Sequence, residues 1–162
     1  GGEGLVPLEE AFLRLAVTLP LAGADPFPVL RDGALQFPHS IYLQGGLAVR
    51  EMESADSVVS NRGRERLAGA ADRARQTGRE ALFGTNITAL CHNLGLAYER
   101  AGRPERAIRS YQHALPYNPA PEVTRLRLAQ AYRQWADNLA ERGDGQAAAA
   151  AREQAEELSM RL

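Results

Sequence analysis

Residues 91–119, CHNLGLAYERAGRPERAIRSYQHALPYNP, decide the fold. Gly95 and Ala107 are small, which allows two antiparallel helices to approach each other closely. Tyr98 and Tyr111 are large enough to fill the space beside them. The stretch therefore predicts a pair of tightly packed helices.

A turn is expected between these two helices. Gly102 can adopt the positive φ of a helix C-terminus, and Pro104 suits the first turn of the helix that follows. One such pair cannot bury its apolar face alone, so neighbouring pairs must stack on it to make a continuous core.

The spacing of this stretch recurs on both sides of it, at steps of 34 and 41 residues downstream and 49 residues upstream. The second downstream step exceeds the first by about two helical turns, which lengthens a helix without rotating its buried face. The matched positions are Leu94, Gly95 and Tyr98 with Leu128, Ala129 and Tyr132; Gly102, Ala107 and Ala114 with Gly143, Ala148 and Ala155; and Tyr42, Gly46 and Val49 with Cys91, Gly95 and Tyr98.

Residues 91–119 resemble the tetratricopeptide repeat, a helix–turn–helix of about 34 residues with the pattern W-x2-L-G-x2-Y, then Ala, an aromatic residue, Ala and Pro. Every spacing fits, with Cys91 in the place of tryptophan. The resemblance implies an all-α, right-handed α-solenoid of about four antiparallel helix pairs in a single domain, residues 5–161. We expect a well-matched unit at 88–121, a stretched unit at 122–161, a degenerate unit at 39–87 and a weak unit at 7–38.

Gly and Pro divide the chain into eight expected helices. Few Val, Ile or Thr residues alternate as a half-buried strand requires, whereas long stretches rich in Ala, Leu and Arg favour helices. The expected helices lie near residues 6–19, 26–36, 39–53, 62–82, 86–101, 104–117, 121–142 and 144–161.

The last of these helices contains five consecutive alanines, at 147–151, which favour helicity but provide little bulk. It either packs very closely on the helix at 121–142 or caps the array with a thin face. Trp135 is the expected anchor of this contact. An exposed Trp135 would instead be a candidate interface residue.

Composition excludes several classes of function. Nineteen arginines oppose 20 acidic side chains, for a formal net charge of −1, so general binding to nucleic acid is not expected. One cysteine excludes an internal disulfide and a cysteine-cluster zinc site. No window of about 18 apolar residues is present, so we expect no transmembrane segment within this chain.

No catalytic arrangement is recognisable, and we predict a protein that is not an enzyme and holds no cofactor or metal. His39, His92 and His113 stand in no H-x3-H or H-E-x-x-H pattern. Cys91 falls on an apolar helical stripe, which indicates a buried small hydrophobe. The triplet at 86–88 matches a glycosylation acceptor, but Asn86 is expected to cap a helix.

The resemblance also implies a concave groove lined by the first helix of each unit. Asn93 and Arg127 resemble two members of the clamp that holds a C-terminal carboxylate in some repeats of this family, although the lysines of that clamp are absent. The alternative to this clamp is that the Asn93 side chain forms a hydrogen bond to nearby backbone. The expected groove residues are His92, Asn93, Leu96, Glu99, Arg100, Leu126, Arg127, Gln130 and Arg133.

A second binding surface is suggested by the arginine-rich helix expected at 62–82, whose arginines flank an apolar face. One interpretation is an amphipathic helix whose arginine stems cover the edges of its core. The other is a basic docking patch for an acidic partner or anionic headgroups. The patch comprises Arg62, Arg66, Arg73, Arg75 and Arg79.

These observations favour a non-catalytic protein-interaction scaffold that holds a peptide or a partner's helix in its groove. The alternative is a structural or oligomerisation appendage of a larger protein, one that could be membrane-bound, such as a polysaccharide-assembly enzyme or glycosyltransferase. The chain begins Gly-Gly-Glu-Gly, and we expect it to be a segment of a longer protein. Self-association is left open.

Overall fold

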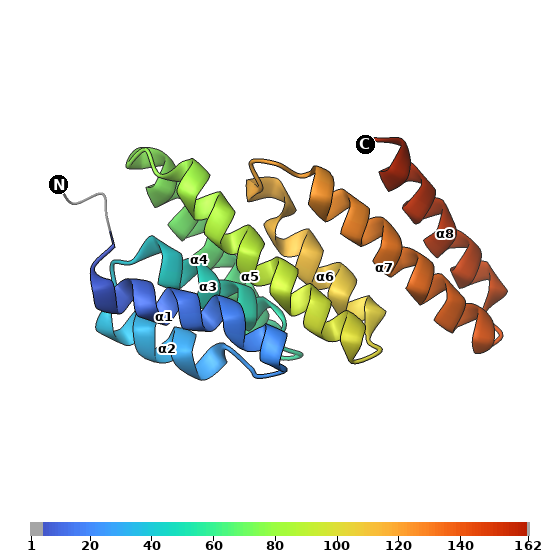
Figure 1. Ribbon diagram of the computed structural model, residues 1–162, viewed down its shortest axis with the longest axis horizontal. Coiled ribbons are helices and arrows are strands. Elements are labelled where there is room, and N and C mark those ends of the chain that lie inside the picture. The colour runs from blue at the N-terminus through green and yellow to red at the C-terminus, as the bar shows by residue number, and fades with distance from the viewer. Residues whose placement is uncertain (1–4, 162) are drawn as a thin grey trace.

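The computed structural model describes residues 5–161, and every regular element in them is helical. The prediction of an all-α fold with eight α-helices is confirmed (Figure 1). The elements are α1 (Pro7–Thr18), the 3-10 turn η1 (Leu19–Ala22), α2 (Phe27–Gln36), α3 (Ile41–Met52), α4 (Ser57–Gln76), α5 (Glu80–Arg100), α6 (Pro104–Ala114), the 3-10 turn η2 (Leu115–Tyr117), α7 (Glu122–Glu141) and α8 (Gly145–Met160).

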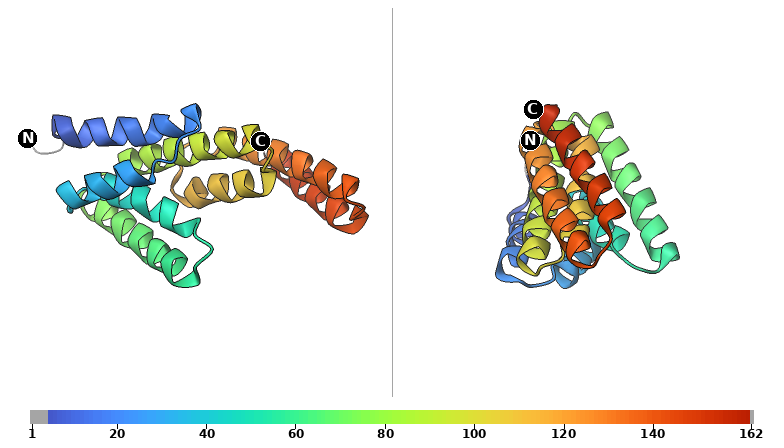
Figure 2. Two further views of the ribbon diagram at one scale, coloured as in Figure 1. Left: turned by 90° about the horizontal axis from the view of Figure 1, so that it is seen from below. Right: turned by 90° about the vertical axis from the view of Figure 1, so that its right-hand side faces the viewer.

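Consecutive helices pack as antiparallel pairs, α3 with α4, α5 with α6 and α7 with α8, and α6 packs on α7 to join the last two pairs. In Figure 2 (left) α3 lies above α4 and α5 lies above α6, on the side where α1 runs, and α7 continues from α5 along the array. We refer to the α3–α5–α7 side as the inner face. The arrangement is a solenoid of tetratricopeptide-like helix pairs.

The α5–α6 pair is held by the contact between Gly95, where the sequence predicted a close approach of the helices, and Tyr111, predicted to fill the space beside it. A Cβ atom on Gly95 would lie 2.3 Å from the Cε1 atom of Tyr111, so only glycine lets the ring lie against this backbone. Tyr111 is 1% exposed and fills the space between the helices. The turn is also as predicted, because Gly102 has φ +72° and Pro104 starts α6.

The break between α4 and α5 differs from the prediction. The helix expected at 62–82 ends at Gln76, and Gly78, with φ +71°, follows it. Asn86 is not a cap; it lies inside α5, where its Nδ2 donates to the Leu82 carbonyl oxygen at 3.0 Å. The expected division between units, at residues 87 and 88, therefore falls within one continuous helix.

The N-terminal half is built around α3. Nearly all its residues from Ile41 to Val49 are buried, with Gln44 the partly exposed one. Gly45 and Gly46 allow this burial, because a Cβ on either would lie within 2.8 Å of a neighbouring side chain from α5 or α2. Helix α1 packs on α2 and extends past α3 to reach α5, which places it on the inner face (Figure 2).

The alanine-rich helix α8 packs closely on α7, which is the first of the two alternatives expected for it. Ala148 and Ala151 of α8 are buried against Ala136 and Leu139 of α7. Trp135 is half-buried and packs against this cluster. The Arg142 guanidinium lies 5.4 Å from the centre of its indole ring.

Substituting Gly95 by alanine tests the helix–helix contact. The new methyl group would meet the Tyr111 ring, so we expect the free energy of unfolding, measured by urea denaturation, to fall by roughly 1–3 kcal/mol. Gly69→Ala is the matched control, because its Cβ meets only Arg73 at 4.0 Å. The control should gain up to about 1 kcal/mol from helix propensity. Equal gains at both positions would contradict the predicted close approach.

Candidate partner-binding site

The predicted groove residues lie on α5 and α7, and they divide into three strips that face different surroundings. The first strip, Asn93 and Arg100, faces α1 and η1. The second comprises His92, Leu96 and Glu99 of α5 with Arg127 of α7. The third follows α7 through Leu126, Gln130 and Arg133, at helical spacing on one face.

The first strip is occupied by the chain itself. The Asn93 Nδ2 atom donates to the carbonyl oxygen of Val17 at 2.6 Å, and the Arg100 Nη1 atom donates to that of Leu21 at 3.4 Å. These carbonyls belong to the end of α1 and to η1, where a helix leaves acceptors without internal partners. Asn93 therefore hydrogen-bonds to backbone, which was the alternative to a role in a carboxylate clamp. The backbone that it binds is not nearby in the sequence but 76 residues away.

The second strip centres on the Tyr111 ring. The rings of His92 and Tyr111 meet edge to face with centroids 5.8 Å apart, and the Tyr111 hydroxyl donates to Glu99 Oε2 at 2.9 Å. Burial raises the pKa of Tyr111, and its bond to Glu99 adds to the effect. The Glu99 carboxylate is thus engaged within the α5–α6 pair.

Arg127 approaches the second strip from α7. Burial lowers the pKa of His92, and the neighbouring Arg127 guanidinium lowers it further, so this histidine is neutral near pH 7. His92, Leu96 and Arg127 are all half-buried rather than enclosed. The second strip therefore combines an apolar side chain, a neutral imidazole and a positive charge on a partly exposed face.

The third strip lies at the C-terminal end of the array. Leu126 is 44% exposed and Gln130 is also exposed. Arg133 is directed toward the last helix, because its Nη2 atom donates to the Ser159 hydroxyl at 2.9 Å. This strip is a surface of α7 with an exposed apolar side chain.

The arginine patch is largely engaged within the molecule. Arg66 donates from Nε to Glu51 Oε1 at 2.7 Å and from Nη1 to Gln44 Oε1 at 2.6 Å, which ties α4 to α3. Arg62 lies 3.5 Å from the other oxygen of Glu51, which is 9% exposed.

The other arginines of the patch are placed differently from the expectation. Arg75 pairs with Asp72 one turn away, and Arg73 is exposed on α4. Arg79 lies beyond the end of α4 and precedes α5. Four of the five arginines therefore lie on α4, and Arg79 lies in the break between α4 and α5.

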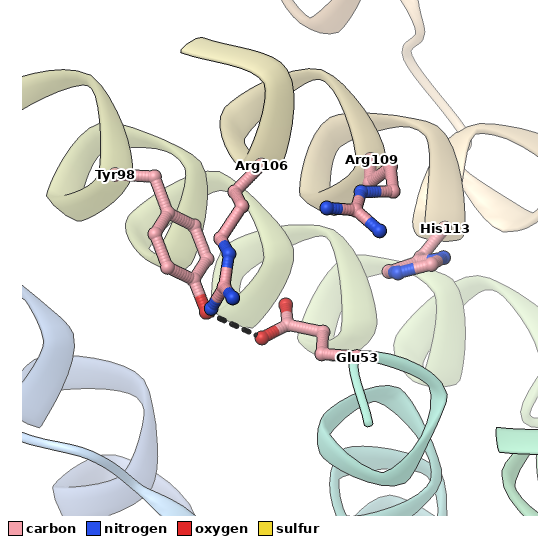
Figure 3. A pocket seen from close by; sticks show the side chains of 5 residues that line it. All are labelled: Glu53, Tyr98, Arg106, Arg109 and His113. Atoms are coloured by element: carbon pink, nitrogen blue, oxygen red, sulfur yellow. Dashed lines mark hydrogen bonds between the residues drawn. The ribbon is translucent and has the colours of Figure 1, made fainter. Parts of the chain in front are cut away.

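A small cavity of about 10 Å³ lies where α3, α5 and α6 meet (Figure 3). Glu53, just after α3, accepts hydrogen bonds from the Tyr98 hydroxyl at 2.6 Å and the Ser110 hydroxyl at 3.0 Å. Burial and the bond to Glu53 raise the pKa of Tyr98 to about 12. Nothing in the local sequence of Glu53 indicates partners 45 and 57 residues away, so its role could not be predicted from the sequence. The arrangement fixes three helices together.

His113 borders the same cavity with Arg109, and Figure 3 shows both side chains turned toward it. Burial lowers the pKa of His113 to about 4, and the positive charges of Arg109 and Arg64 contribute to the shift. The folded state therefore favours the neutral imidazole.

Little in the described residues is arranged for catalysis. Cys91 is 1% exposed, and burial raises the pKa of its thiol, which disfavours the thiolate nucleophile. Between residues 5 and 161, no three His, Cys, Asp or Glu side chains converge to hold a metal ion. Across the same residues, no helix has both the length and the hydropathy to cross a bilayer.

Removing Arg66 tests whether the arginine patch is structural. Arg66→Ala removes the main partner of the buried Glu51 carboxylate, so we expect the free energy of unfolding to fall by about 1–3 kcal/mol. Arg73→Ala, an exposed matched control on the same helix, should stay within about 0.5 kcal/mol of the parent. Urea denaturation measures both. If neither variant changed the free energy of unfolding, Arg66 would not be structural and would again be a candidate residue for docking a partner.

The pKa of His113 predicts a dependence of stability on pH. An unfolded histidine titrates near about 6.5, so protonation favours the unfolded chain as pH falls from there toward 4. We expect the free energy of unfolding to decrease across this window and the decrease to shrink in His113→Gln. The exposed His39→Gln variant is the control. An unchanged slope in His113→Gln would show that this side chain is not buried as a neutral imidazole.

Comparison with known proteins agrees with the geometry of the α5–α6 pair. Residues 90–121 match the family model described as tetratricopeptide repeat. No curated protein and no solved structure matches the chain significantly. The matched residues cover the second half of α5, α6, η2 and the turn that leads to α7. The chain thus contains a tetratricopeptide repeat at residues 90–121, within an all-α solenoid of similar helix pairs.

Proposed function

We propose that this protein is a non-catalytic interaction domain that binds a peptide or a partner's helix on the inner face, along α5 and α7. The observation that carries the proposal is the engagement of Asn93 and Arg100 with the carbonyls of Val17 and Leu21. On this face, polar side chains of the repeat already hold a polypeptide segment. A tetratricopeptide repeat supports protein partners in general.

The second and third strips supply what a bound polypeptide needs. Leu96 and Leu126 are partly exposed apolar side chains that can serve as anchors. Arg127 adds a positive charge, whereas Glu99 is hydrogen-bonded to Tyr111. The positive charge of Arg127 favours a ligand that offers carbonyl or carboxylate oxygens beside an apolar side chain.

The binding surface proposed is narrower than the nine groove residues expected from sequence. Asn93 and Arg100 contact α1 and η1, and Arg133 contacts α8. His92, Leu96, Glu99, Leu126, Arg127 and Gln130 remain as the candidate contacts.

Selection from a displayed random-peptide library tests the proposal without knowledge of the natural partner. We expect peptides enriched on the parent chain to lose at least ten-fold in affinity for Leu96→Glu and Leu126→Glu variants. Val58→Glu is the matched control, because Val58 is 72% exposed on α4, and α4 lies on the far side of α3 from α1 (Figure 2). Circular dichroism checks that all variants keep their helicity.

The outcome separates the surfaces of the molecule. Peptides that bind parent and inner-face variants equally, but fail on Val58→Glu, would place the binding surface on the outer helices. Failure of the library to yield any peptide would count against a peptide-binding role. Self-association through the inner face is the remaining possibility. Analytical ultracentrifugation of the parent chain alone tests it by measuring whether the chain is a monomer or an oligomer.

A further inference from the structure

Helix α1 shows how the inner face of this chain receives a helix. Val17 is bound by Asn93, and four residues later Leu21 is bound by Arg100, so α1 with η1 runs in the same direction as α5. The two donors are seven residues apart, two turns along one face of α5. The binding site for α1 on α5 therefore includes two polar side chains that donate hydrogen bonds to the carbonyls at the end of a parallel helix.

The internal repeat places an equivalent pair of donors on α7. The step of 34 residues that relates Leu94 to Leu128 also relates Asn93 to Arg127 and Arg100 to Gln134. The burial pattern keeps the same register, because positions 90, 94 and 95 of α5 and positions 124, 128 and 129 of α7 are all buried. Arg127 and Gln134 therefore occupy on α7 the places that the two donors occupy on α5.

The second pair differs from the first in binding no backbone carbonyl of residues 5–161. Arg127 and Gln134 are half-buried, and neither side chain makes a hydrogen bond or ion pair to any of residues 5–161. Arg127 is near enough to His92 of α5 to depress the pKa of the imidazole. Arg127 thus lies beside the strip of α5 that includes His92, on the side of α7 that faces α5.

We infer that the partner of the inner face is a helix that lies along α7, parallel to it, and ends where Arg127 and Gln134 bind its last backbone carbonyls. The inference deepens the proposed function and rests on it. The carbonyl end of a helix is the negative pole of its dipole, which Arg127 complements as Arg100 does for α1 and η1. The occupant resembles α1 in chemistry, with leucine and alanine turned inward and the end of the helix exposed.

The side chains of α1 define that chemistry further. Leu13 and Ala16 are buried, with Ala16 1% exposed, and both line a narrow space shared with Ile87 and Leu90 of α5. Ala16, a small residue two positions before the end of α1, lets the backbone of α1 approach α5 closely. A proline one or two residues beyond the end, as Pro20 follows α1, prevents the carbonyls from being used by a further turn of α-helix.

The test uses a peptide of residues 5–24 of this chain, with an amidated C-terminus and an N-terminal fluorophore, titrated with the full chain by fluorescence anisotropy. We expect saturable one-to-one binding that weakens ten-fold or more in Arg127→Ala and in Gln134→Ala. The double variant Arg73→Ala, Gln76→Ala is the matched control, because both residues are exposed on α4. The control should bind as the parent does.

Three outcomes would overturn the inference. Absence of binding by the amidated peptide would reject an α1-like helix, while the library selection tests the wider function separately. Binding that Asn93→Ala weakens and Arg127→Ala leaves unchanged would show exchange with α1 on α5. Binding by the free-acid peptide alone would show that the site recognises a carboxylate rather than the carbonyls of a helix end.

Discussion

The contact between the Tyr111 ring and the Gly95 backbone determines how α5 and α6 pack, and other features of the site depend on it. The ring is buried, and its edge-to-face contact with His92 reaches the inner face. Its hydroxyl needs a partner when buried, which Glu99 supplies from α5. Glu99 is engaged in this way, and we propose that a ligand on the second strip meets the positive charge of Arg127. A packing requirement inside one repeat thus sets the electrostatics of the surface beside it.

The inner face is not uniform along the molecule. At its N-terminal end α3 is buried and α1 crosses over to α5 (Figure 2). Toward the C-terminus, α5 and α7 present partly exposed side chains, including Leu96 and Leu126. The chain therefore supplies its own example of a helix bound by the repeat, and we propose that α7 offers the equivalent position to a partner. We propose that partner binding on this face uses the same chemistry as the internal packing of α1.

Local sequence determined what could be predicted. The small residue at 95, the aromatic at 111 and the turn at 102 lie within one repeat, so their spacing alone identified the α5–α6 pair. The end of α4 was placed too late, because Gly78 has no proline near it and Asn86 can serve inside a helix as well as at its cap. The bonds from Asn93 to Val17 and from Tyr98 to Glu53 join residues 76 and 45 positions apart. No local pattern encodes such contacts, so neither the occupant of α5 nor the role of Glu53 could be predicted.

The central claim is that α1 is a permanent occupant of the inner face and that α7 is the position open to a partner. Amide hydrogen exchange of the chain without any partner tests it most directly. The account predicts that α1 is protected to a similar degree as α3 and α5, because its buried side chains and carbonyl bonds join it to their core. Exchange of α1 as fast as in an isolated helix, with α3 and α5 still protected, would contradict the account and leave the α5 surface open as well.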